Sequence, residues 1–230
     1  MPDPLIKLRD VGLTYRTRTG AFSVDRFRAL DGISFDLFAG ETLGIVGSNG
    51  SGKSTLLRVL AGIYTPDTGT LEYNDVGRIS LLSLGLGFAP ELSGVENAIF
   101  GSMLLGASLS EAQGKLEEIV EFAELGDFMR KPIRTYSSGM RSRLAFAVAL
   151  LMETDVLLID EVLAVGDAHF RKKSEAALRH KIKSGQAVVL VSHSLAQVAS
   201  LCERAAWVHQ GKMMYLGDAS ETVKKYKEAL

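Results

Sequence analysis

The stretch "GSNGSGKST", Gly47 to Thr55, constrains the fold of this chain more than any other feature. It places three glycines, three serines and one lysine directly after the apolar run "TLGIV" and directly before a helical pattern. Glycines here let successive backbone N–H groups close around the oxygens of a phosphate, because no side chain intrudes. Gly47, Gly52, Lys53 and Ser54 meet the spacing G-x-x-x-x-G-K-[ST]. The sequence therefore predicts a strand, a phosphate-binding loop and a helix, in that order.

Every residue of this phosphate loop is a candidate ligand of a nucleotide, with ATP and Mg²⁺ as the expected ligand and cofactor. Lys53 is expected to reach the β and γ phosphates, and the Ser54 hydroxyl to hold Mg²⁺. The alternative, a glycine-rich turn without a ligand, explains neither the lysine nor the hydroxyl at their fixed offsets. The predicted phosphate-binding residues are Gly47, Ser48, Asn49, Gly50, Ser51, Gly52, Lys53, Ser54 and Thr55.

Two adjacent acids end the apolar run "VLLIDE". A strand ending in Asp160 delivers its carboxylate to the carboxyl edge of a parallel sheet, the edge at which the phosphate loop also opens. Asp160 is therefore a candidate Mg²⁺ ligand, through water, and Glu161 is a candidate for orienting or deprotonating the attacking water. The alternative is that the two acids cap the next helix.

The remaining pattern is that of an α/β chain. "TLGIVG", "DVLLID" and "AVVLVSH" are short, continuous and β-branched, as strands buried on both faces of a parallel sheet are. Helical patterns separate them, whereas "LIKLRDVGLTY" and "AWVHQGKMMYLGD" alternate like strands of an antiparallel layer, the latter turning at Gln210 and Gly211. The acidic, helical section 86–136 reads as an insert, with a capping box at Ser108 and Glu111.

Composition restricts the class of partner. The 230 residues are 47% hydrophobic, and 26 basic against 27 acidic residues give a formal net charge of −1. Nothing in that balance favours nucleic acid. The longest apolar run, "LAFAVALLM", is far below the ~20 residues that span a bilayer. The start of the sequence lacks the pattern of a secretory signal, and one cysteine, Cys202, excludes an internal disulfide and is expected to be buried and unreactive.

A family resemblance enters at "TYSSGMRSRLAFAVAL", where Ser137, Ser138, Gly139 and Met140 resemble the signature motif of ABC-type ATPases. The signature lies upstream of the Asp160 strand, and His193 of "VSHS" resembles the switch histidine of the same family. "DEVLAVGDA" and "LGLGFAPELSGVENAIF" are similar to longer phrases in ATP-binding subunits of exporters of O-antigen, capsular polysaccharide or teichoic acid.

The resemblance implies a P-loop NTPase (RecA-like) fold, with a parallel-sheet core, an antiparallel β subdomain and an inserted α-helical subdomain. It implies one ATPase domain over 1–230, with the core and β subdomain in 1–85 and 141–230. The helical subdomain and the signature segment, Ser137 to Met140, then fall in 86–140.

The resemblance also implies a head-to-tail homodimer in which each ATP lies between the phosphate loop of one copy and the signature segment of the other. Asp167 resembles the loop residue through which the two sites communicate, and His193 the residue that contacts the γ-phosphate and positions water. Taken alone, "SSGMRSR" reads as an ordinary helix cap, and a histidine that ends a buried strand reads as a structural residue.

Tyr15 is the candidate for stacking on adenine, with Phe22 as its rival and a structural tyrosine as the alternative to both. Two departures from the family pattern stand out. "ISLLSLGLGFAPELSG" lacks the glutamine that many transport ATPases carry there, leaving Ser83 or a main-chain group in its place. Met140 stands where glutamine is commoner, which puts its side-chain contacts in doubt but leaves its backbone available.

The implied function is ATP hydrolysis that drives export of a lipid-linked polysaccharide. The implied partners are a second copy and two copies of an integral membrane permease, at the cytoplasmic face of the inner membrane, with no nucleic acid. The segment containing Phe88 and Glu91 is expected to face the permease. A carbohydrate-binding C-terminal domain, present in some of these exporters, has no room here. The alternatives are a soluble ABC ATPase of DNA repair or translation, and a binding module with vestigial hydrolysis.

Overall fold

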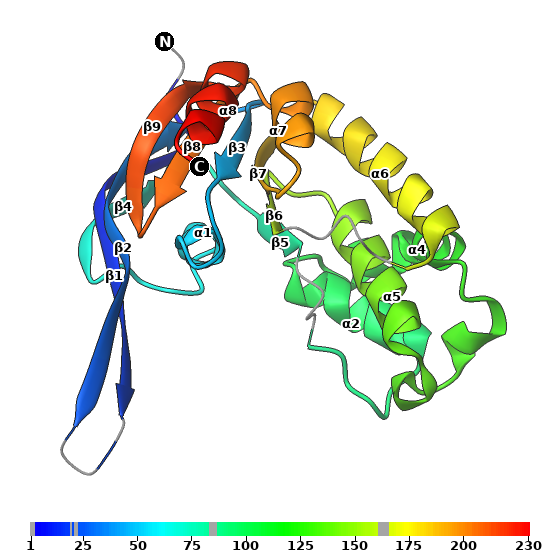
Figure 1. Cartoon of the computed structure of the whole chain (residues 1–230). Coiled ribbons are helices and arrows are strands. Elements are labelled where there is room, and N and C mark those ends of the chain that lie inside the picture. The colour runs from blue at the N-terminus through cyan, green and yellow to red at the C-terminus, as the bar shows by residue number, and fades with distance from the viewer. Residues whose placement is uncertain (1–2, 19, 21–22, 83–86, 161–165) are drawn as a thin grey trace. The chain divides into compact units, whose positions relative to one another are not determined.

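The computed structural model describes residues 3–18, 20, 23–82, 87–160 and 166–230. Glu161, Phe22 and Ser83, named above, lie outside the described residues. The chain divides into two compact units, shown in Figure 1. The first unit comprises Met1–Val76, Leu158–Glu161 and Gly185–Leu230, and the second comprises Gly77–Leu157 and Val162–Ser184. The expected helical section 86–140 lies within the second unit, which also takes in residues on either side of it and a further segment, Val162–Ser184.

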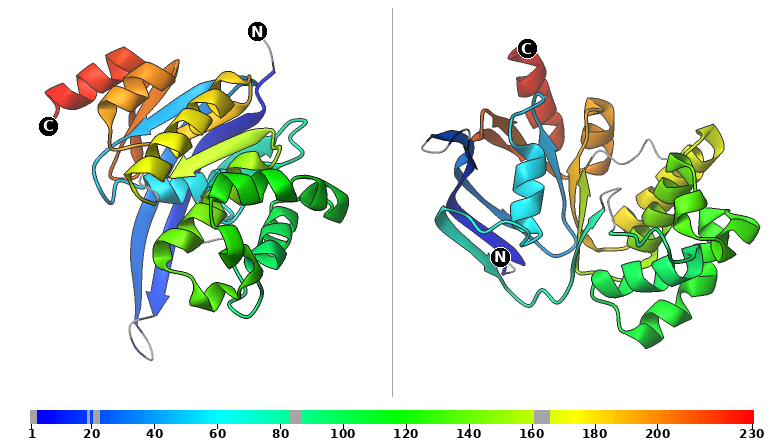
Figure 2. Two further views of the ribbon diagram at one scale, coloured as in Figure 1. Left: turned by 90° about the vertical axis from the view of Figure 1, so that its right-hand side faces the viewer. Right: turned by 90° about the horizontal axis from the view of Figure 1, so that it is seen from below.

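The first unit contains a three-stranded antiparallel sheet in the order β2-β1-β4. Strand β1 (Ile6–Arg18) pairs with β2 (Val24–Leu37) on one side and β4 (Thr68–Tyr73) on the other. The register places Tyr15 opposite Phe27. The two long strands form a hairpin whose far half is exposed and extends beyond the rest of the sheet (Figures 1 and 2).

The buried sheet of the first unit runs β6-β7-β3-β8-β9. The three continuous apolar runs form strands as predicted, and every residue of β3 and β7 is buried. Strand β3 is parallel to both β7 and β8, and β8 turns back antiparallel into β9. The predicted turn is confirmed at Gln210 (φ 48°) and Gly211 (φ 77°). The strands are β3 (Thr42–Val46), β6 (Val156–Asp160), β7 (Ala187–Val191), β8 (Arg204–His209) and β9 (Lys212–Asp218).

Three helices cover strands of the first unit: α1 (Lys53–Leu60), α7 (Leu195–Leu201) and α8 (Ala219–Glu228). Val46, Val198 and Val223 share a core cluster that joins α7 and α8 to the sheet. Cys202 is half-buried at the end of α7 and packs against this cluster. Burial, with a smaller contribution from Glu203, raises the pKa of its thiol to about 12, so the thiolate is negligible at neutral pH.

The second unit is mostly helical. Its short strand β5 (Ile79–Leu82) begins beside the start of β6, where the Arg78 carbonyl accepts hydrogen bonds from the Asp155 and Val156 amides. Helix α6 packs on α4 and α5 through the rings of Phe122, Phe146 and Phe170. The helices are α2 (Gly94–Leu104), α3 (Leu109–Gly114), α4 (Leu116–Ala123), α5 (Ser138–Leu151) and α6 (Ala168–Lys183), with 3-10 turns at Gly126–Arg130 and Ile133–Thr135.

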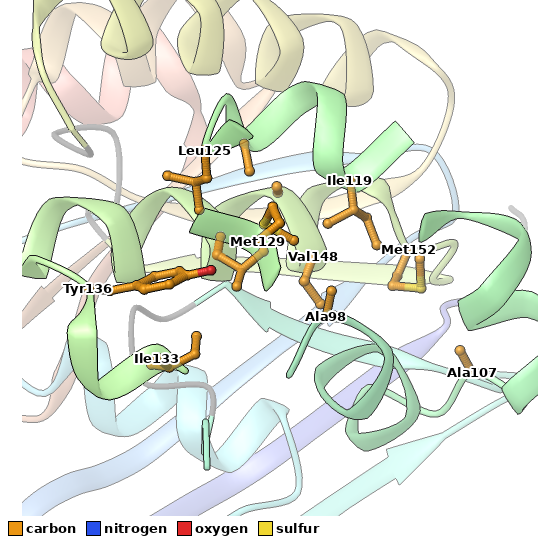
Figure 3. Packing of buried hydrophobic residues seen from close by; sticks show 12 residues of the cluster. Ala98, Ala107, Ile119, Leu125, Met129, Ile133, Tyr136, Val148 and Met152 are labelled. Atoms are coloured by element: carbon orange, nitrogen blue, oxygen red, sulfur yellow. The ribbon is translucent and has the colours of Figure 1, made fainter. Parts of the chain in front are cut away.

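The helical core of this unit gathers apolar side chains from α2, α4, α5 and both 3-10 turns (Figure 3). Tyr136, 4% exposed, lies in it and donates its hydroxyl to the Phe128 carbonyl at 2.6 Å. Burying each large aliphatic side chain there contributes about 1.5–3 kcal/mol. The residue before the signature segment is thus anchored in the core.

The predicted capping box at Ser108 and Glu111 is confirmed, and a second one joins Ser93 and Glu96 at the start of α2. The hydrogen bonds from Ser93 hold the pKa of the Glu96 carboxyl below its ordinary value. The acidic helical section is divided where α3 ends at Gly114, because glycine is a poor helix former. None of the described helices is both long and apolar enough to cross a membrane.

Candidate functional site

The phosphate loop holds a backbone conformation that requires glycine at two positions. Gly47 has φ 156°, and a β-carbon there would lie 2.2 Å from the Val208 carbonyl oxygen. Gly52 has φ 106°, and a β-carbon there would lie 2.6 Å from the Ala29 carbonyl oxygen. Because both neighbours are main chain, neither contact is relieved by a side-chain rotation. The geometry of the loop thus depends on the absence of side chains at Gly47 and Gly52.

Hydrogen bonds tie the loop into the sheets on either side. The Gly211 amide donates to the Ser51 carbonyl at 2.9 Å, and the Asp31 amide donates to the Gly211 carbonyl at 2.8 Å. The Lys53 ammonium, 7% exposed, donates to the Gly47 and Ser48 carbonyls at 2.8 Å each. These bonds hold the cation in the concave side of the loop.

A cavity of about 210 Å³ opens beside the loop in the first unit. It brings together Lys53, Ser54, Asp160 and His193, which come from α1, the end of β6 and the segment after β7. Parallel strands place their carboxyl ends on one edge, which is why residues so distant in sequence meet there. We call this the nucleotide cavity; its lining is completed by Phe27, Ala29, Asn49, Gly50, Gly52, Thr55 and Val191.

The donors in the nucleotide cavity fit magnesium. Ser54 and Asp160 offer oxygen atoms, the ligands that Mg²⁺ prefers. Among the described residues no group of three or more His, Cys, Asp or Glu side chains is arranged for a metal. A cation held by one hydroxyl and one carboxylate would complete its shell with water and phosphate oxygens, as Mg²⁺ does in phosphate-transfer sites.

The aromatic candidates lie on one face of the β1–β2 hairpin. The Tyr15 hydroxyl is 3.1 Å from Thr55 Oγ1, and its ring meets Tyr64 edge-on with centroids 5.8 Å apart. Phe27, directly opposite Tyr15, is 60% exposed and lines the nucleotide cavity, which Tyr15 does not. Sequence reasoning missed Phe27; the cross-strand pairing, invisible in a single strand, is what reveals it.

The signature segment begins helix α5 in the second unit. Ser137 caps the helix by accepting a hydrogen bond from the Met140 amide at 3.2 Å. The expectation that the Met140 backbone is available is therefore wrong for its N–H, because the third amide of a helix is the one that such a cap satisfies. Its side chain is partly buried against the helical core. Ser138 and Gly139 supply the first two amides of the helix.

A second cavity, of about 590 Å³, lies beside this segment within the second unit. We call it the signature cavity; its lining comprises Ser137, Ser138, Gly139, Met140, Ser142, Arg143, Glu124, Leu125, Phe128, Gly166 and Asp167. It places Asp167 beside the signature segment, and a role of Asp167 in communication between the two nucleotide sites stays a prediction. Asp167 caps α6 through the Phe170 amide, and this hydrogen bond is the main cause that lowers the pKa of its carboxyl, with Arg143 adding to it.

Arg143 connects the two parts of the signature cavity. Its guanidinium pairs with the Asp167 carboxylate and lies 4.9 Å from the centre of the Phe170 ring. The Arg143 side chain is 18% exposed and that of Asp167 is 60% exposed, so solvent reaches the pair from the Asp167 side. Sequence reasoning did not identify Arg143; an arginine one helical turn into α5 carries no local signal of its partner 24 positions away.

The described geometry thus assembles the predicted residues into two groups, one in each unit. Six residues of the phosphate loop share the nucleotide cavity with Asp160 and His193, whereas Gly47, Ser48 and Ser51 do not line it. The signature segment and Asp167 share the signature cavity. A family described as ABC transporter matches residues 30–164, more than half of the chain. The chain belongs to the ABC transporter family.

Several curated proteins similar to this chain are named for export of O-antigen or of teichoic acids. The O-antigen export system ATP-binding protein RfbB of Myxococcus xanthus is 49% identical over 203 residues, 88% of this chain and 46% of that protein. The RfbB of Klebsiella pneumoniae is 41% identical over 206 residues, 89% of this chain and 83% of that protein. The teichoic acids export ATP-binding protein TagH of Lactiplantibacillus plantarum is 42% identical over 209 residues, 91% of this chain and 57% of that protein. The predicted resemblance to this group is confirmed, although the chain spans about half the length of two of these relatives.

Solved ABC cassettes share the fold. The ATP-binding cassette MJ0796, in a dimeric post-hydrolysis state bound to ADP and Pi, superposes with a TM-score of 0.75 at 24% identity, covering 93% of this chain and 98% of that one. An ATP-binding subunit of an ABC transporter gives a TM-score of 0.78 at 19% identity, covering 97% and 93%. The predicted P-loop NTPase fold, with its antiparallel sheet and inserted helices, is confirmed.

Proposed function

We propose that the chain is the ATP-hydrolysing subunit of an exporter of lipid-linked polysaccharide of the O-antigen, capsule or teichoic acid type. The observation that carries the proposal is the nucleotide cavity, in which a lysine, a hydroxyl, a carboxylate and a histidine converge from three separate elements. The names of the similar proteins support the export role, and the family supports work beside a membrane permease at the cytoplasmic face of the inner membrane.

In this proposal the phosphate loop binds the triphosphate through its amides and Lys53. The ammonium already rests on the Gly47 and Ser48 carbonyls, so little side-chain freedom is lost when it pairs with the β and γ phosphates. Ser54 and Asp160 hold Mg²⁺, which would neutralise charge on the phosphate oxygens. His193 contacts the γ-phosphate, and Glu161, the neighbour of Asp160 in the chain, orients or deprotonates the attacking water.

The signature segment serves the nucleotide of a second copy. Ser138 and Gly139 stand at the N-terminus of a 14-residue helix, where amides and helix dipole favour an anion. Their contact with a γ-phosphate ends when that phosphate is cleaved and leaves. ATP thereby holds two copies together before hydrolysis and releases them afterwards.

Glu161→Gln tests the proposal. This variant should bind MgATP with parental affinity but turn it over at least ~100-fold more slowly, because general-base assistance contributes at least that factor. It should then accumulate as an ATP-dependent dimer on gel filtration. The matched control is Glu117→Gln, an exposed acid of α4, which should behave as the parent. Parental turnover in Glu161→Gln would refute the assignment of the base.

The aromatic face of the hairpin is proposed to receive the adenine. Tyr15 remains the sequence-based candidate, but its hydroxyl and ring edge already have neighbours, whereas Phe27 is exposed and faces the cavity. Phe27→Ala should therefore weaken ATP binding by more than Tyr15→Ala, with a stacking contribution of roughly 1–3 kcal/mol. Equal affinities for ATP and inorganic triphosphate in the parent would argue against any stacking.

Helix α2 is proposed as the face that docks the permease. Phe100, Met103 and Leu104 are 50%, 43% and 59% exposed, an apolar surface suited to a protein partner. Phe88 instead packs against the helical core, so of the two residues expected from sequence the exposed Glu91, 3.6 Å from Arg134, is the cleaner probe.

Leu104→Asp and Glu91→Ala should each reduce polymer export in cells while leaving the ATPase activity of the isolated chain intact. The control is Ile63→Asp, an apolar residue of the first unit that is 57% exposed. It should leave both activities unchanged. Equal losses of export and of soluble ATPase activity in Leu104→Asp would contradict a docking role.

A further inference from the structure

The β1–β2 hairpin has a second face, opposite to the one that carries Tyr15 and Phe27. The register pairs Thr14 with Arg28 and Arg16 with Arg26. Because side chains alternate along a strand, these residues share the face that points away from the aromatic pair. Phe27 lines the nucleotide cavity, so the arginine face belongs to a different surface of the same hairpin.

Positive charge is concentrated in this hairpin. The 15 residues from Thr14 to Arg28 contain four arginines and one aspartate, a net charge of +3 on a chain whose formal net charge is −1. All four arginines are exposed. A local positive field of this kind attracts an anion even where the whole protein does not.

Two of these arginines, Arg16 and Arg26, have no counter-ion among the residues that the structure describes. Arg16 and Arg26 stand directly opposite each other, and like charges in that position destabilise a sheet. Within the described part of the chain, neither guanidinium has a hydrogen bond or an ion pair. Arg28 pairs with Asp31 at 2.7 Å, which fixes its position on the same surface. An anion bound between the arginines would relieve the repulsion.

The arginines border a hollow of about 490 Å³ that a side chain at Gly12 would obstruct. A β-carbon on Gly12 would lie 2.5 Å from Thr68 Oγ1 and 3.7 Å from Arg28 Nη2. Asp67 also borders the hollow, but its carboxylate accepts the Thr14 amide at 2.6 Å and so is engaged by the main chain. The hollow therefore presents three guanidinium groups and two threonine hydroxyls around an open floor.

We propose that this arginine hollow binds a phosphate group, as a phosphoric ester or a diphosphate. A planar guanidinium donates two parallel hydrogen bonds to a phosphate. Arg16 and Arg26 supply positive charge that attracts a multiply charged oxyanion rather than a neutral glycan or a cation, and Arg28, which is already paired with Asp31, adds hydrogen-bond donors. The site goes beyond the proposed ATPase function, because it lies on the other face of the hairpin and uses none of the residues of the nucleotide cavity.

Calorimetric titration with sodium pyrophosphate tests the site in a Lys53→Ala background, in which the phosphate loop binds phosphate more weakly. We expect saturable binding of one pyrophosphate per chain that weakens as salt is raised. Arg16→Gln and Arg26→Gln should each weaken it about 10-fold or more, the effect of losing a charge-assisted hydrogen bond. Arg9→Gln is the matched control, because Arg9 lies in the same strand but pairs with Asp36 at 2.7 Å.

A stability readout guards against loss of folding. Without pyrophosphate, Arg26→Gln should raise the Tm slightly, because it removes the cross-strand repulsion. With pyrophosphate, the parental background should gain Tm and the variant should not. A fall in Tm of the variant without pyrophosphate would count against the proposal, since the repulsion would then not exist.

The phosphate could belong to a free ester or to a lipid headgroup. Co-sedimentation of the protein with phospholipid vesicles distinguishes these two sources. Pyrophosphate binding that depends on Arg16 and Arg26 supports the proposed site and indicates that its ligand is a free phosphate compound. Arginine-dependent binding to phosphatidylglycerol vesicles, but not to phosphatidylcholine vesicles, without pyrophosphate binding supports it with a lipid source. Binding to neither, or binding unaffected by both arginine variants, would overturn the proposal. None of these outcomes depends on Glu161 or on ATP turnover, so each stands apart from the test of the ATPase.

Discussion

The phosphate loop and the signature segment both present the N-terminus of a helix, but they leave different amides exposed. The N-cap residue of helix α1 is Gly52, and among the described residues no side chain caps this helix. The N-cap residue of helix α5 is Ser137, whose side chain accepts a hydrogen bond from the Met140 amide. The first arrangement is shaped by missing side chains and leaves the amides of an entire helical turn free for a ligand. The second leaves only the amides of Ser138 and Gly139 free. The phosphate loop therefore offers enough free amides to bind a ligand by itself, whereas the signature segment can only add contacts to a ligand that is bound elsewhere.

Glycine substitutions should break this contrast with the largest effect. Gly47→Ala should abolish ATP binding and lower the free energy of unfolding by roughly 1–3 kcal/mol or more, because the new methyl group meets the Val208 carbonyl. A β-carbon at Gly139 would meet only Ser137 Oγ, at 3.8 Å. Gly139→Ala should therefore keep its Tm and its ATP affinity as a monomer, yet lose about 10-fold in dimer turnover through crowding.

Urea unfolding, calorimetry and an ATPase assay measure these three quantities. Gly50→Ala separates backbone strain from collision, because Gly50 has φ 76° but no atom near its would-be β-carbon. If Gly139→Ala lost ATP affinity as a monomer, the distinction between the two helix ends would be wrong.

Lys53→Ala should show the next largest effect. Removing a charge-assisted hydrogen bond costs about 1.5–3 kcal/mol, so ATP affinity should fall by roughly 10- to 100-fold, measured by calorimetry. The two carbonyls that Lys53 now binds belong to the loop, and water can replace the ammonium there. An equal loss of AMP affinity would contradict the role, because AMP has no β or γ phosphate.

Arg143→Gln sharpens the description of the signature cavity. The variant should lose Tm and dimer turnover but not the monomer's ATP affinity, because Arg143 packs on Phe170 and pairs with Asp167. The pKa of Asp167 should remain below its ordinary value, because the Phe170 amide is the main cause of the shift. NMR titration of the carboxyl measures this.

The lowered pKa of Asp167 fixes the direction in which pH changes the stability of the chain. A depressed pKa in the folded chain means that the carboxylate contributes stability above its ordinary pKa of 3.8, and that this contribution is lost as pH falls through the folded value. A pKa restored to its ordinary value in Arg143→Gln would show that the ion pair, not the helix cap, dominates.

The smallest effect concerns the strand that leads into the phosphate loop. A β-carbon on Gly44 of β3 would lie 3.1 Å from Cys202 Sγ, so the thiol packs against the strand. With a pKa of about 12, it should react slowly with iodoacetamide at pH 8 until the chain unfolds. Since the pKa of the Cys202 thiol is raised in the folded state, the contribution of this protonated thiol to stability is complete below about pH 8.5, the ordinary pKa of cysteine. It is lost as pH approaches 12. Rapid alkylation of the native chain would show that the packing of Cys202 against β3 opens readily.

Much of the nucleotide cavity was predictable because its parts carry local signals. Continuous apolar runs indicated β3, β6 and β7, and the carboxyl-edge rule then placed Asp160 near the phosphate loop. The antiparallel strand β2 carried no such signal: its first five residues are exposed, and it is a strand because β1 pairs with it. Phe27 and Arg26 owe their positions to that pairing.

The second unit shows the same limit. The capping box at Ser108 was readable from four residues, whereas the pairing of Arg143 with Asp167 depends on how α5 and α6 pack. The hydrogen bond from the Met140 amide to Ser137 is that of an ordinary helix cap, which the sequence alone indicates. The family resemblance instead suggested that the Met140 backbone is available to a ligand. Local patterns predict elements and their ends; contacts between elements need the packed structure.

The single, shielded thiol of Cys202 has a practical consequence. A cysteine newly placed on α2 or beside the signature segment would react with a spin label or fluorophore far faster than Cys202 does. Distances between two copies could then be followed through a catalytic cycle without first rebuilding the hydrophobic interior around β3.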